Sequence, residues 1–256
     1  MKVIICADEH EVGRVAADEA VALLAGKQTP VLGFATGSSP LRLYEELARR
    51  VAAGELDLRH AAGYALDEYV GIEPTHPLSY RETIRQTVIV PLGMDPARVH
   101  VPDGMAEDLQ AAADRYDAAI AQAGGVDVQI LGIGSNGHIG FNEPSSSLSS
   151  RTRVKALTQR TRSDNARFFD DPDEVPSLCV TQGLGTIMDS RCALMVVTGE
   201  HKADAVAAMI EGPVSAACPA SVLQFHRKAI VVIDEASASK LQLADYYRRV
   251  AEVDPW

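Results

Sequence analysis

Apolar and polar residues alternate along this chain in blocks that predict strands and helices in turn. Short apolar runs bounded by glycine, proline or polar residues predict buried strands, and they cover residues 3–5, 31–34, 63–66, 126–131, 193–197 and 230–233. Between them, apolar residues at helical spacing predict helices over residues 12–24, 40–51, 106–122, 202–210 and 237–250. This alternation predicts a single α/β domain over residues 1–256, with a Rossmann-like, mostly parallel sheet and helices on both faces.

One segment, residues 151–175, departs from the alternation because it is rich in charged and polar residues. We expect it to form a β-extension and a helix that serve as a lid. No segment approaches the roughly 18 apolar residues of a membrane helix, and the first residues are typical of a strand rather than a signal peptide. The four cysteines are scattered without metal-ligand spacing, so we expect buried thiols in a cytoplasmic protein.

The formal net charge of −11 limits the partners of the chain. Nucleic acids and anionic membranes are bound by basic surfaces, so this charge argues against both. A small anionic substrate remains possible, provided that its site concentrates the local positive charge.

The glycine-rich segment 131–144, LGIGSNGHIGFNEP, directly follows the apolar run 126–131. Its glycines let the backbone turn sharply and approach a ligand closely. Ligands of open α/β sheets bind outside the carboxyl ends of the strands, which places His138 and Glu143 where chemistry is done. His138 can move protons near neutral pH, and Glu143 can orient it. An ordinary glycine-rich connection with an exposed histidine is the alternative.

A second segment, GFATGSSP over residues 33–40, precedes a helical pattern, and Ser39 is placed to cap that helix. The backbone amides around Gly37 and the hydroxyls of Thr36, Ser38 and Ser39 would form a phosphate-binding nest at the helix N-terminus. We favour phosphate binding over a simple capped turn, because three hydroxyls around one glycine exceed what capping needs.

Asp67 and Glu68 follow the apolar run 63–66, in LDEYVG. Adjacent strand residues point to opposite faces, so only one carboxylate need enter a site, where it could act as the base for a carbon acid. A solvated acidic turn is the alternative. Arg167, in NARFF, and Lys202, near the start of a predicted helix, could supply charge for a phosphate, although either could instead be a surface residue.

Together these motifs resemble the glucosamine-6-phosphate deaminase family over essentially the whole chain and in the same order. The resemblance rests on LGFATGSSP, LDEYVG, GIGSNGHIGFNEP, SSRTRVKALT, NARFFDD, GEHKADAV and DYYRRV. It implies an enzyme that converts glucosamine 6-phosphate and water into fructose 6-phosphate and ammonia, by aldose–ketose isomerisation coupled to deamination. It also implies that no metal or organic cofactor is needed, because the substrate's own carbonyl and amine make the adjacent C–H acidic.

The resemblance gives the candidate residues specific roles. It implies that Asp67 removes the C2 proton of the open-chain sugar and returns a proton to C1. It implies that His138, paired with Glu143, assists ring opening by protonating the ring oxygen. The phosphate would be held by the GSS loop together with Arg167 and Lys202.

One position departs from the pattern of many family members, which carry an aspartate two residues before the histidine. Here the residue is Asn136. An amide can still orient a ring nitrogen but adds no negative charge beside it, so we expect ring opening to depend more on Glu143. Asn136 remains a catalytic candidate.

Two other functions stay open as alternatives. The related 6-phosphogluconolactonases share the fold and a glycine–histidine loop but lack the FNEP ending, so a lactonase-like hydrolase is a minor alternative. A non-catalytic sugar-phosphate sensor is the second. The presence of both Asp67 and His138 favours an enzyme over a sensor.

The resemblance also suggests regulation. In allosteric members the activator N-acetylglucosamine 6-phosphate binds between subunits, through residues that match Ser146, Ser147, Arg153, Lys155 and Tyr246. Arg153 and Lys155 alternate along an expected strand, so their side chains share one face and could hold a second phosphate. A solvated basic edge strand is the alternative. We therefore expect an allosteric homo-oligomer, and by resemblance a hexamer.

Overall fold

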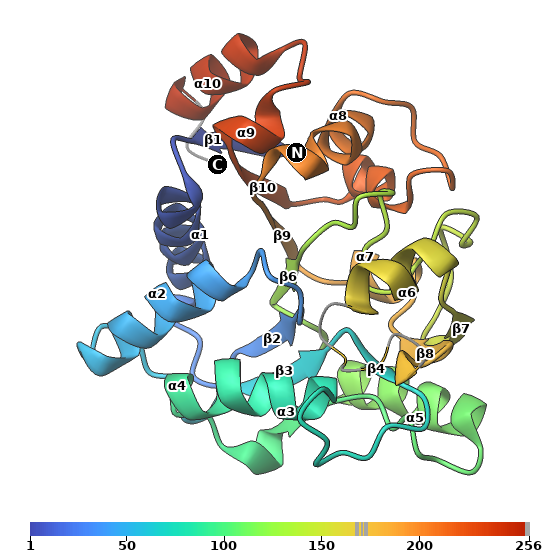
Figure 1. Cartoon of the computed structure of the whole chain (residues 1–256). Coiled ribbons are helices and arrows are strands. Elements are labelled where there is room, and N and C mark those ends of the chain that lie inside the picture. The colour runs from blue at the N-terminus through green and yellow to red at the C-terminus, as the bar shows by residue number, and fades with distance from the viewer. Residues whose placement is uncertain (167–168, 170, 172–173, 254–256) are drawn as a thin grey trace.

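The computed structural model describes residues 1–166, 169, 171 and 174–253. Within these residues its larger sheet has seven strands, and each strand pairs with its neighbours in parallel (Figure 1). From edge to edge the order is β1 (Lys2–Cys6), β10 (Ala229–Asp234), β9 (Cys192–Val197), β6 (Val128–Leu131), β2 (Val31–Phe34), β3 (Ala62–Ala65) and β5 (Val99–His100). The expected parallel sheet is confirmed.

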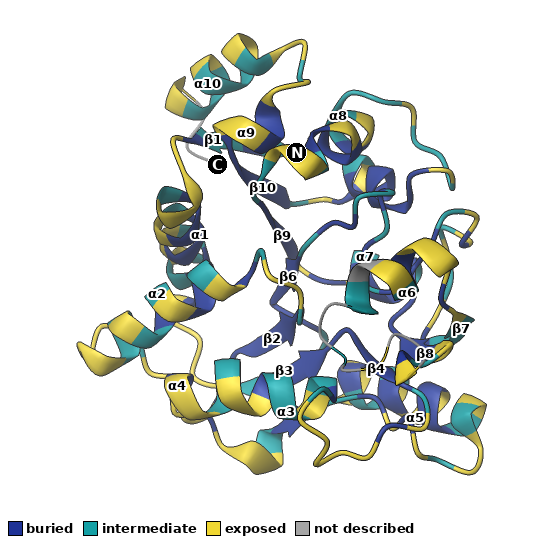
Figure 2. Ribbon diagram, viewed as in Figure 1, coloured by how far each residue is buried: buried dark blue, intermediate teal, exposed yellow. Residues whose placement is uncertain are grey.

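Helices cover both faces of this sheet, because successive residues of a strand point to opposite sides. In β10, Ile230 and Val232 belong to one hydrophobic core, while Val231 and Ile233 belong to another. The helices that pack into these cores are α1 (Glu9–Leu24) and α2 (Leu41–Ala52) on the first side, and α7 (Leu184–Met188) and α8 (Ala203–Ile210) on the second. The central strands β2, β6, β9 and β10 are therefore buried along their length (Figure 2), which explains why they occur in the sequence as mostly apolar runs.

A smaller antiparallel sheet begins after β3, from which only Leu66 separates its first strand. It consists of β4 (Asp67–Tyr69), β8 (Leu178–Thr181) and β7 (Arg153–Ala156), in that order. Helix α6 (Gln159–Ala166) follows β7, so the segment expected to be a β-extension and a helix contains both elements. Because β4 directly continues the chain from β3, this second sheet is attached at the carboxyl edge of the first.

The remaining described helices lie around these two sheets. A continuous helical stretch comprises α3 (Tyr80–Ile84), a π-helical turn (Arg85–Ile89) and α4 (Val90–Leu92). The others are α5 (Leu109–Gln122), α9 (Glu235–Ala238), α10 (Ala244–Val253) and three 3₁₀ turns (Pro96–Arg98, Glu200–Lys202 and Pro219–Phe225).

The single helix expected over residues 237–250 is wrong, because the chain forms α9 and α10 with a break between them. The carboxylate of Glu211 accepts hydrogen bonds from the backbone N–H groups of Gln242 and Leu243, each at 2.9 Å. These bonds hold the connecting residues outside any helix, through a partner about 30 residues away that helical periodicity cannot reveal.

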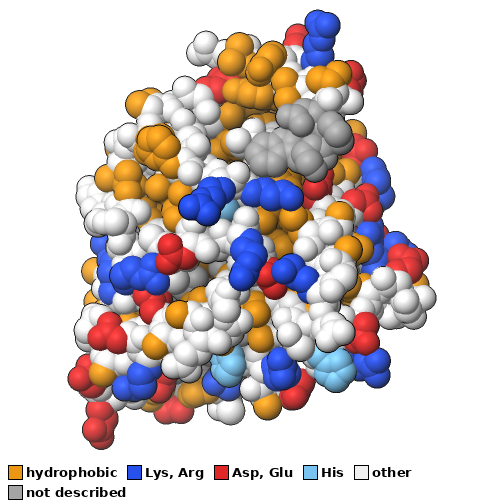
Figure 3. All heavy atoms as spheres, turned by 180° about the vertical axis from the view of Figure 1, so that it is seen from behind, with side chains coloured by type: hydrophobic (Ala, Val, Ile, Leu, Met, Phe, Trp, Pro, Cys, Tyr) orange, Lys and Arg blue, Asp and Glu red, His pale blue; other side chains and the backbone are white. Residues whose placement is uncertain are grey.

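Within the described residues, no helix is long and apolar enough to cross a membrane. Figure 3 shows the molecule from behind, with Lys and Arg side chains gathered toward the middle of this face and interspersed with acidic and apolar ones. On the part of this face that is described, they do not join into one continuous basic stripe.

Candidate active site

The candidate site lies where the order of the strands reverses. From β2 the chain proceeds outward to β3 and β5, whereas from β6 it proceeds in the other direction to β9 and β10. Such a switch point leaves a crevice at the carboxyl ends of the two central strands. A cavity of about 380 Å³ lies there. Its lining includes the sequence-derived candidates Thr36, Gly37, Ser38, Ser39, Asp67, His138 and Lys202.

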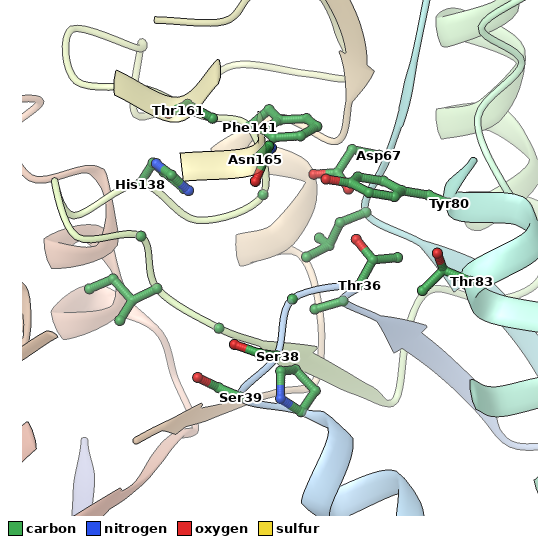
Figure 4. A pocket seen from close by; sticks show the side chains of 18 of the residues that line it. Thr36, Ser38, Ser39, Asp67, Tyr80, Thr83, His138, Phe141, Thr161 and Asn165 are labelled. Atoms are coloured by element: carbon green, nitrogen blue, oxygen red, sulfur yellow. The ribbon is translucent and has the colours of Figure 1, made fainter. Parts of the chain in front are cut away.

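The loop after β2 presents hydroxyl groups to one end of this cavity (Figure 4). The expected capping role of Ser39 is wrong, because α2 begins at Leu41 and its N-cap is Pro40, which makes no side-chain capping bond. The backbone is already helical at Pro40, and Leu41 N–H donates to the carbonyl oxygen of Ser38 at 3.2 Å. A Cβ atom at Gly37 would meet no atom of the described residues within 4 Å, so on their side this position is open to a ligand.

Lys202 lines the same cavity from the 3₁₀ turn that leads into α8. Its predicted position near the start of a helix is confirmed. Its ammonium group and the helix N-terminus behind the hydroxyl loop are both suited to an anion. The other expected cation, Arg167, lies outside the described residues.

Asp67 and Glu68 are both only 4% exposed but serve different surroundings. Glu68 accepts hydrogen bonds at 2.9 Å from the backbone N–H groups of Tyr69, Tyr80 and Arg81, so its carboxylate stabilises the start of α3. Asp67 lines the cavity instead. One of the two carboxylates thus enters the site, as the alternation of side chains along a strand allows.

The surroundings of Asp67 favour its neutral form when no ligand charge is near. Burial, reinforced by the negative charge of Glu68, raises the pKa of Asp67 from 3.8 to about 8, although hydrogen bonds from Phe141 N–H and the Thr181 hydroxyl oppose the rise. A carboxyl group with a pKa near neutrality can both accept and return a proton.

The glycine-rich loop after β6 brings the His138 ring to the cavity wall (Figure 4). Gly137 and Gly140 have φ angles of +85° and +52°, in the left-handed region that favours glycine. A Cβ atom on Gly134 would lie 2.1 Å from Cε1 of the His138 ring. The absence of a side chain at Gly134 therefore allows the ring to pack against the backbone.

Asn136 and Glu143 stand behind His138. The Asn136 side chain donates from Nδ2 to Glu143 Oε2 at 2.8 Å and accepts from His138 N–H at 3.2 Å. Nδ1 of the His138 ring lies 3.6 Å from the same Oε2 atom. The amide thus connects the backbone of His138 to the carboxylate that faces its ring.

Two threonines that the sequence reasoning missed complete the surroundings of Glu143. The hydroxyls of Thr158 and Thr161, at the start of α6, both donate to Glu143 Oε1, and Thr161 also lines the cavity. Burial opposes the charged form of Glu143, but the nearby His138 ring and the hydrogen bonds donated by Thr161 and Asn136 outweigh it and lower the pKa of Glu143 to about 2. Two threonines three residues apart at a helix start, with Thr161 N–H bonded to Thr158 Oγ1, were the available signal.

An aromatic wall, which the sequence patterns did not predict as a unit, closes the cavity beside Asp67. It consists of Tyr69, Tyr80, Phe141 and Phe169, whose ring centroids lie 4.8 to 6.1 Å apart in contacting pairs. These rings come from four separate segments of the chain, so no sequence spacing identified them. They give this end of the cavity a largely aromatic lining next to the Asp67 carboxyl group.

The residues matched to an effector site fall into two groups. Arg153 and Lys155 lie on β7, where the Arg153 guanidinium donates to Asn142 Oδ1 at 2.9 Å. Ser146 is buried, and its hydroxyl has no hydrogen-bond partner among the described residues. Ser147 bonds to Ser149 through its hydroxyl at 3.2 Å.

Tyr246 is separate from these residues within one chain. It lies on α10, which packs against β1 at the far edge of the large sheet, and it is 61% exposed. The described residues also contain no cluster of three or more His, Cys, Asp or Glu side chains that could hold a metal ion. All four cysteines are free and buried, as expected.

Sequence comparisons place this chain with one family and with relatives that share one name. The profile of a family described as glucosamine-6-phosphate isomerases/6-phosphogluconolactonase matches residues 8–232. A glucosamine-6-phosphate deaminase of Cutibacterium acnes is 59% identical over 248 residues, which cover 97% of this chain and 95% of the relative. A glucosamine-6-phosphate deaminase of Pseudarthrobacter chlorophenolicus is 55% identical over 255 residues, which cover 100% of this chain and 98% of the relative.

Solved structures show the same fold. A structure described as a monomeric glucosamine-6-phosphate deaminase superimposes with a TM-score of 0.91 at 38% identity, covering 93% of this chain and 99% of the other. A 6-phosphogluconolactonase from Trypanosoma cruzi gives a TM-score of 0.75 at 19% identity, covering 94% of this chain and 97% of the other. The second likeness concerns the fold alone.

Proposed function

The chain belongs to the glucosamine-6-phosphate isomerase/6-phosphogluconolactonase family, and we propose that it is a glucosamine-6-phosphate deaminase that forms fructose 6-phosphate and ammonia. One observation carries the proposal beyond the family. A single cavity has a buried carboxyl group of raised pKa at one end and an anion-binding loop with Lys202 at the other. This arrangement suits a phosphorylated sugar whose carbon-bound proton must be moved.

Asp67 is the base in this proposal. Its neutral form predominates near pH 7 in the absence of other charges, because its pKa is about 8. A protonated amino group on C2 of the substrate would lie beside the carboxyl group and favour its ionised form. An amino sugar therefore helps to generate the base that attacks its own C2–H bond. A lactone has no amino group and would not favour the ionised form of Asp67 in this way.

The remaining candidates hold the two ends of the substrate. Thr36, Gly37, Ser38 and Ser39, with Lys202 and Arg167, would bind the phosphate through backbone amides, hydroxyls and positive charge. His138 would protonate the ring oxygen when the sugar ring opens, and Glu143 would orient it. Asn136 would fix the relation between these two groups through its hydrogen bonds to both residues.

The test is a coupled assay in which purified protein is given glucosamine 6-phosphate as substrate. The two products, fructose 6-phosphate and ammonia, are measured independently of each other. The proposal expects equal amounts of both products and much weaker turnover of unphosphorylated glucosamine. Hydrolysis of 6-phosphogluconolactone, with no ammonia released from glucosamine 6-phosphate, would assign the chain to the other activity in the family's description.

We further propose that N-acetylglucosamine 6-phosphate activates the enzyme at a site between subunits of a homo-oligomer, a hexamer by resemblance. The support is that Arg153 and Lys155 share one face of β7, and that the buried Ser146 hydroxyl lacks a partner among the described residues. Tyr246 lies far from them in one chain, so it could join them only from a neighbouring subunit. The free, buried cysteines and the phosphorylated substrate accord with a cytoplasmic location.

Substrate saturation curves with and without N-acetylglucosamine 6-phosphate test this second proposal, together with sedimentation of the protein. Activation that disappears in an Arg153→Ala, Lys155→Ala variant is expected. Hyperbolic kinetics unaffected by the compound, with sedimentation as a monomer, would contradict it. That outcome would resemble the solved deaminase described as monomeric.

A further inference from the structure

Tyr80 projects from the aromatic wall into the cavity beside Asp67 (Figure 4). Its position is fixed from both sides. Glu68, the neighbour of Asp67, accepts a hydrogen bond from the Tyr80 backbone N–H at 2.9 Å. The Tyr80 ring stacks on Phe141 with a centroid distance of 5.7 Å and an interplanar angle of 20°. The strand that carries the proposed base thus also places this tyrosine.

The hydroxyl of Tyr80 makes a long hydrogen bond to its neighbour in the aromatic wall. Its Oη donates to Tyr69 Oη at 3.3 Å, whereas O–H···O bonds usually measure about 2.7 to 2.8 Å. A phenol hydrogen can rotate about its C–O bond, so a stronger acceptor could replace Tyr69 as its partner. An oxygen that gains negative charge is such an acceptor, because hydrogen bonds to charged oxygens are shorter and stronger.

Tyr69 can support that change of partner. Asn165, on α6, donates to Tyr69 Oη at 2.9 Å, and an amide N–H₂ group can only donate. With its oxygen held by Asn165, Tyr69 can direct its own hydrogen to Tyr80 Oη once the Tyr80 hydrogen has turned toward the cavity. A chain of three hydrogen bonds in one direction then ends at the substrate and strengthens the last donor.

We propose that Tyr80 is a further catalytic residue, which donates a hydrogen bond to the substrate's C1 oxygen as proton abstraction by Asp67 turns that oxygen into an enolate. In this step the C2–H bond breaks and its proton passes to the Asp67 carboxylate. The electron pair of that bond forms the C1–C2 double bond, and the carbonyl pair moves onto O1. Tyr80 keeps its proton throughout and stabilises the charge that O1 acquires.

The electrostatic surroundings of Tyr80 suit a donor that is not itself a base. Burial and the neighbouring Tyr69 and Asp67 raise the pKa of Tyr80 well above its ordinary value, although a hydrogen bond with the Thr36 side chain opposes the rise. The hydroxyl therefore stays protonated over the pH range in which the enzyme would work. In ketosteroid isomerase a neutral tyrosine hydroxyl likewise forms part of the oxyanion hole of the active site.

This inference rests on the proposed deaminase activity, and Tyr80→Phe tests it because phenylalanine keeps the ring contacts and removes only the hydroxyl. We expect kcat for glucosamine 6-phosphate to fall by about 10²-fold, the usual effect of removing one such donor, while KM changes only a few-fold. The kinetic isotope effect with substrate deuterated at C2 should rise, because proton abstraction becomes more fully rate-limiting. Tyr64→Phe is the matched control. The Tyr64 hydroxyl donates a 3.2 Å hydrogen bond to the Ala119 carbonyl oxygen, and Tyr64 is not among the residues that line the cavity.

A second variant covers the case in which Tyr80→Phe does not fold. Incorporation of 3-fluorotyrosine at position 80 keeps the hydroxyl and makes it more acidic, so turnover of the C2-deuterated substrate should increase. The role of Tyr80 would be overturned by unchanged turnover in the 3-fluorotyrosine variant. It would also be overturned if Tyr80→Phe kept the wild-type kcat, with or without a rise in KM. Those results leave deamination by the wild-type protein intact, whereas absence of ammonia release by the wild type would overturn the proposed function and this role together.

Discussion

Replacement of Asp67 by asparagine should change how the stability of the protein depends on pH. In the folded protein the pKa of Asp67 is raised from 3.8 to about 8, mainly by burial. Between these two values the unfolded chain has lost the proton that the folded protein retains. The free energy of unfolding therefore falls as pH rises through this window, and the contribution is fully present only below the lower value.

The size of the effect follows from the pKa difference. One pKa unit corresponds to about 1.4 kcal/mol, so Asp67 lowers the stability of the wild type by up to about 1.4 kcal/mol for each pH unit within the window. Its side chain is only 4% exposed, so screening by solvent is slight. Asp67→Asn removes this titration with little change in shape. Relative to the wild type, the variant should gain up to about 3 kcal/mol between pH 5 and pH 7.

Urea unfolding of both proteins at pH 5, 6, 7 and 8 measures this difference, because titrations shared by the two proteins cancel. The expected result is a stability difference that grows with pH in favour of Asp67→Asn and levels off above about pH 8. A difference that stays constant across this range would refute the raised pKa, and with it the electrostatic argument for Asp67 as the base.

Three further sets of substitutions test the rest of the site. Glu143→Gln should lower the rate on the closed sugar and alter the pH profile of turnover, and an unchanged profile at undiminished activity would make Glu143 structural only. Lys202→Ala should raise KM for the phosphorylated sugar with a smaller effect on kcat, because the phosphate does not react; an unchanged KM would remove Lys202 from the phosphate site. Gly134→Ala should lower kcat sharply, since its methyl group would displace the His138 ring, whereas the methyl group of Gly37→Ala meets no atom of the described residues and should mainly weaken phosphate binding. Steady-state kinetics of each variant measures these effects. A near-normal kcat for Gly134→Ala would contradict the predicted displacement of the His138 ring.

The central strands and their loops could be predicted because their signals are local. The runs 31–34 and 126–131 are apolar throughout most of their length, since both faces of the parallel sheet are covered, and glycine-rich loops follow them directly. Because ligands bind beyond the carboxyl ends of such strands, the cavity between these loops followed from the same pattern.

The parts that could not be predicted depend on pairings between distant residues. Asp67 pairs with Thr181 across the second sheet, more than a hundred residues away, and no periodicity in either segment indicates this. The donors from Thr158 and Thr161 to Glu143 likewise depend on where α6 lies in space. The wrong expectation for Ser39 was local in origin, because a serine before proline satisfies the capping pattern whether or not the helix begins there.

The chemistry of the whole site can be tested by following the hydrogen at C2 of the substrate. We expect wild-type protein to convert glucosamine 6-phosphate deuterated at C2 into equal amounts of fructose 6-phosphate and ammonia, more slowly than the undeuterated sugar. Asp67→Asn should lower this rate by about 10²-fold or more. Ammonia release without an isotope effect in either protein, and at equal rates in both, would show that Asp67 does not remove the C2 proton.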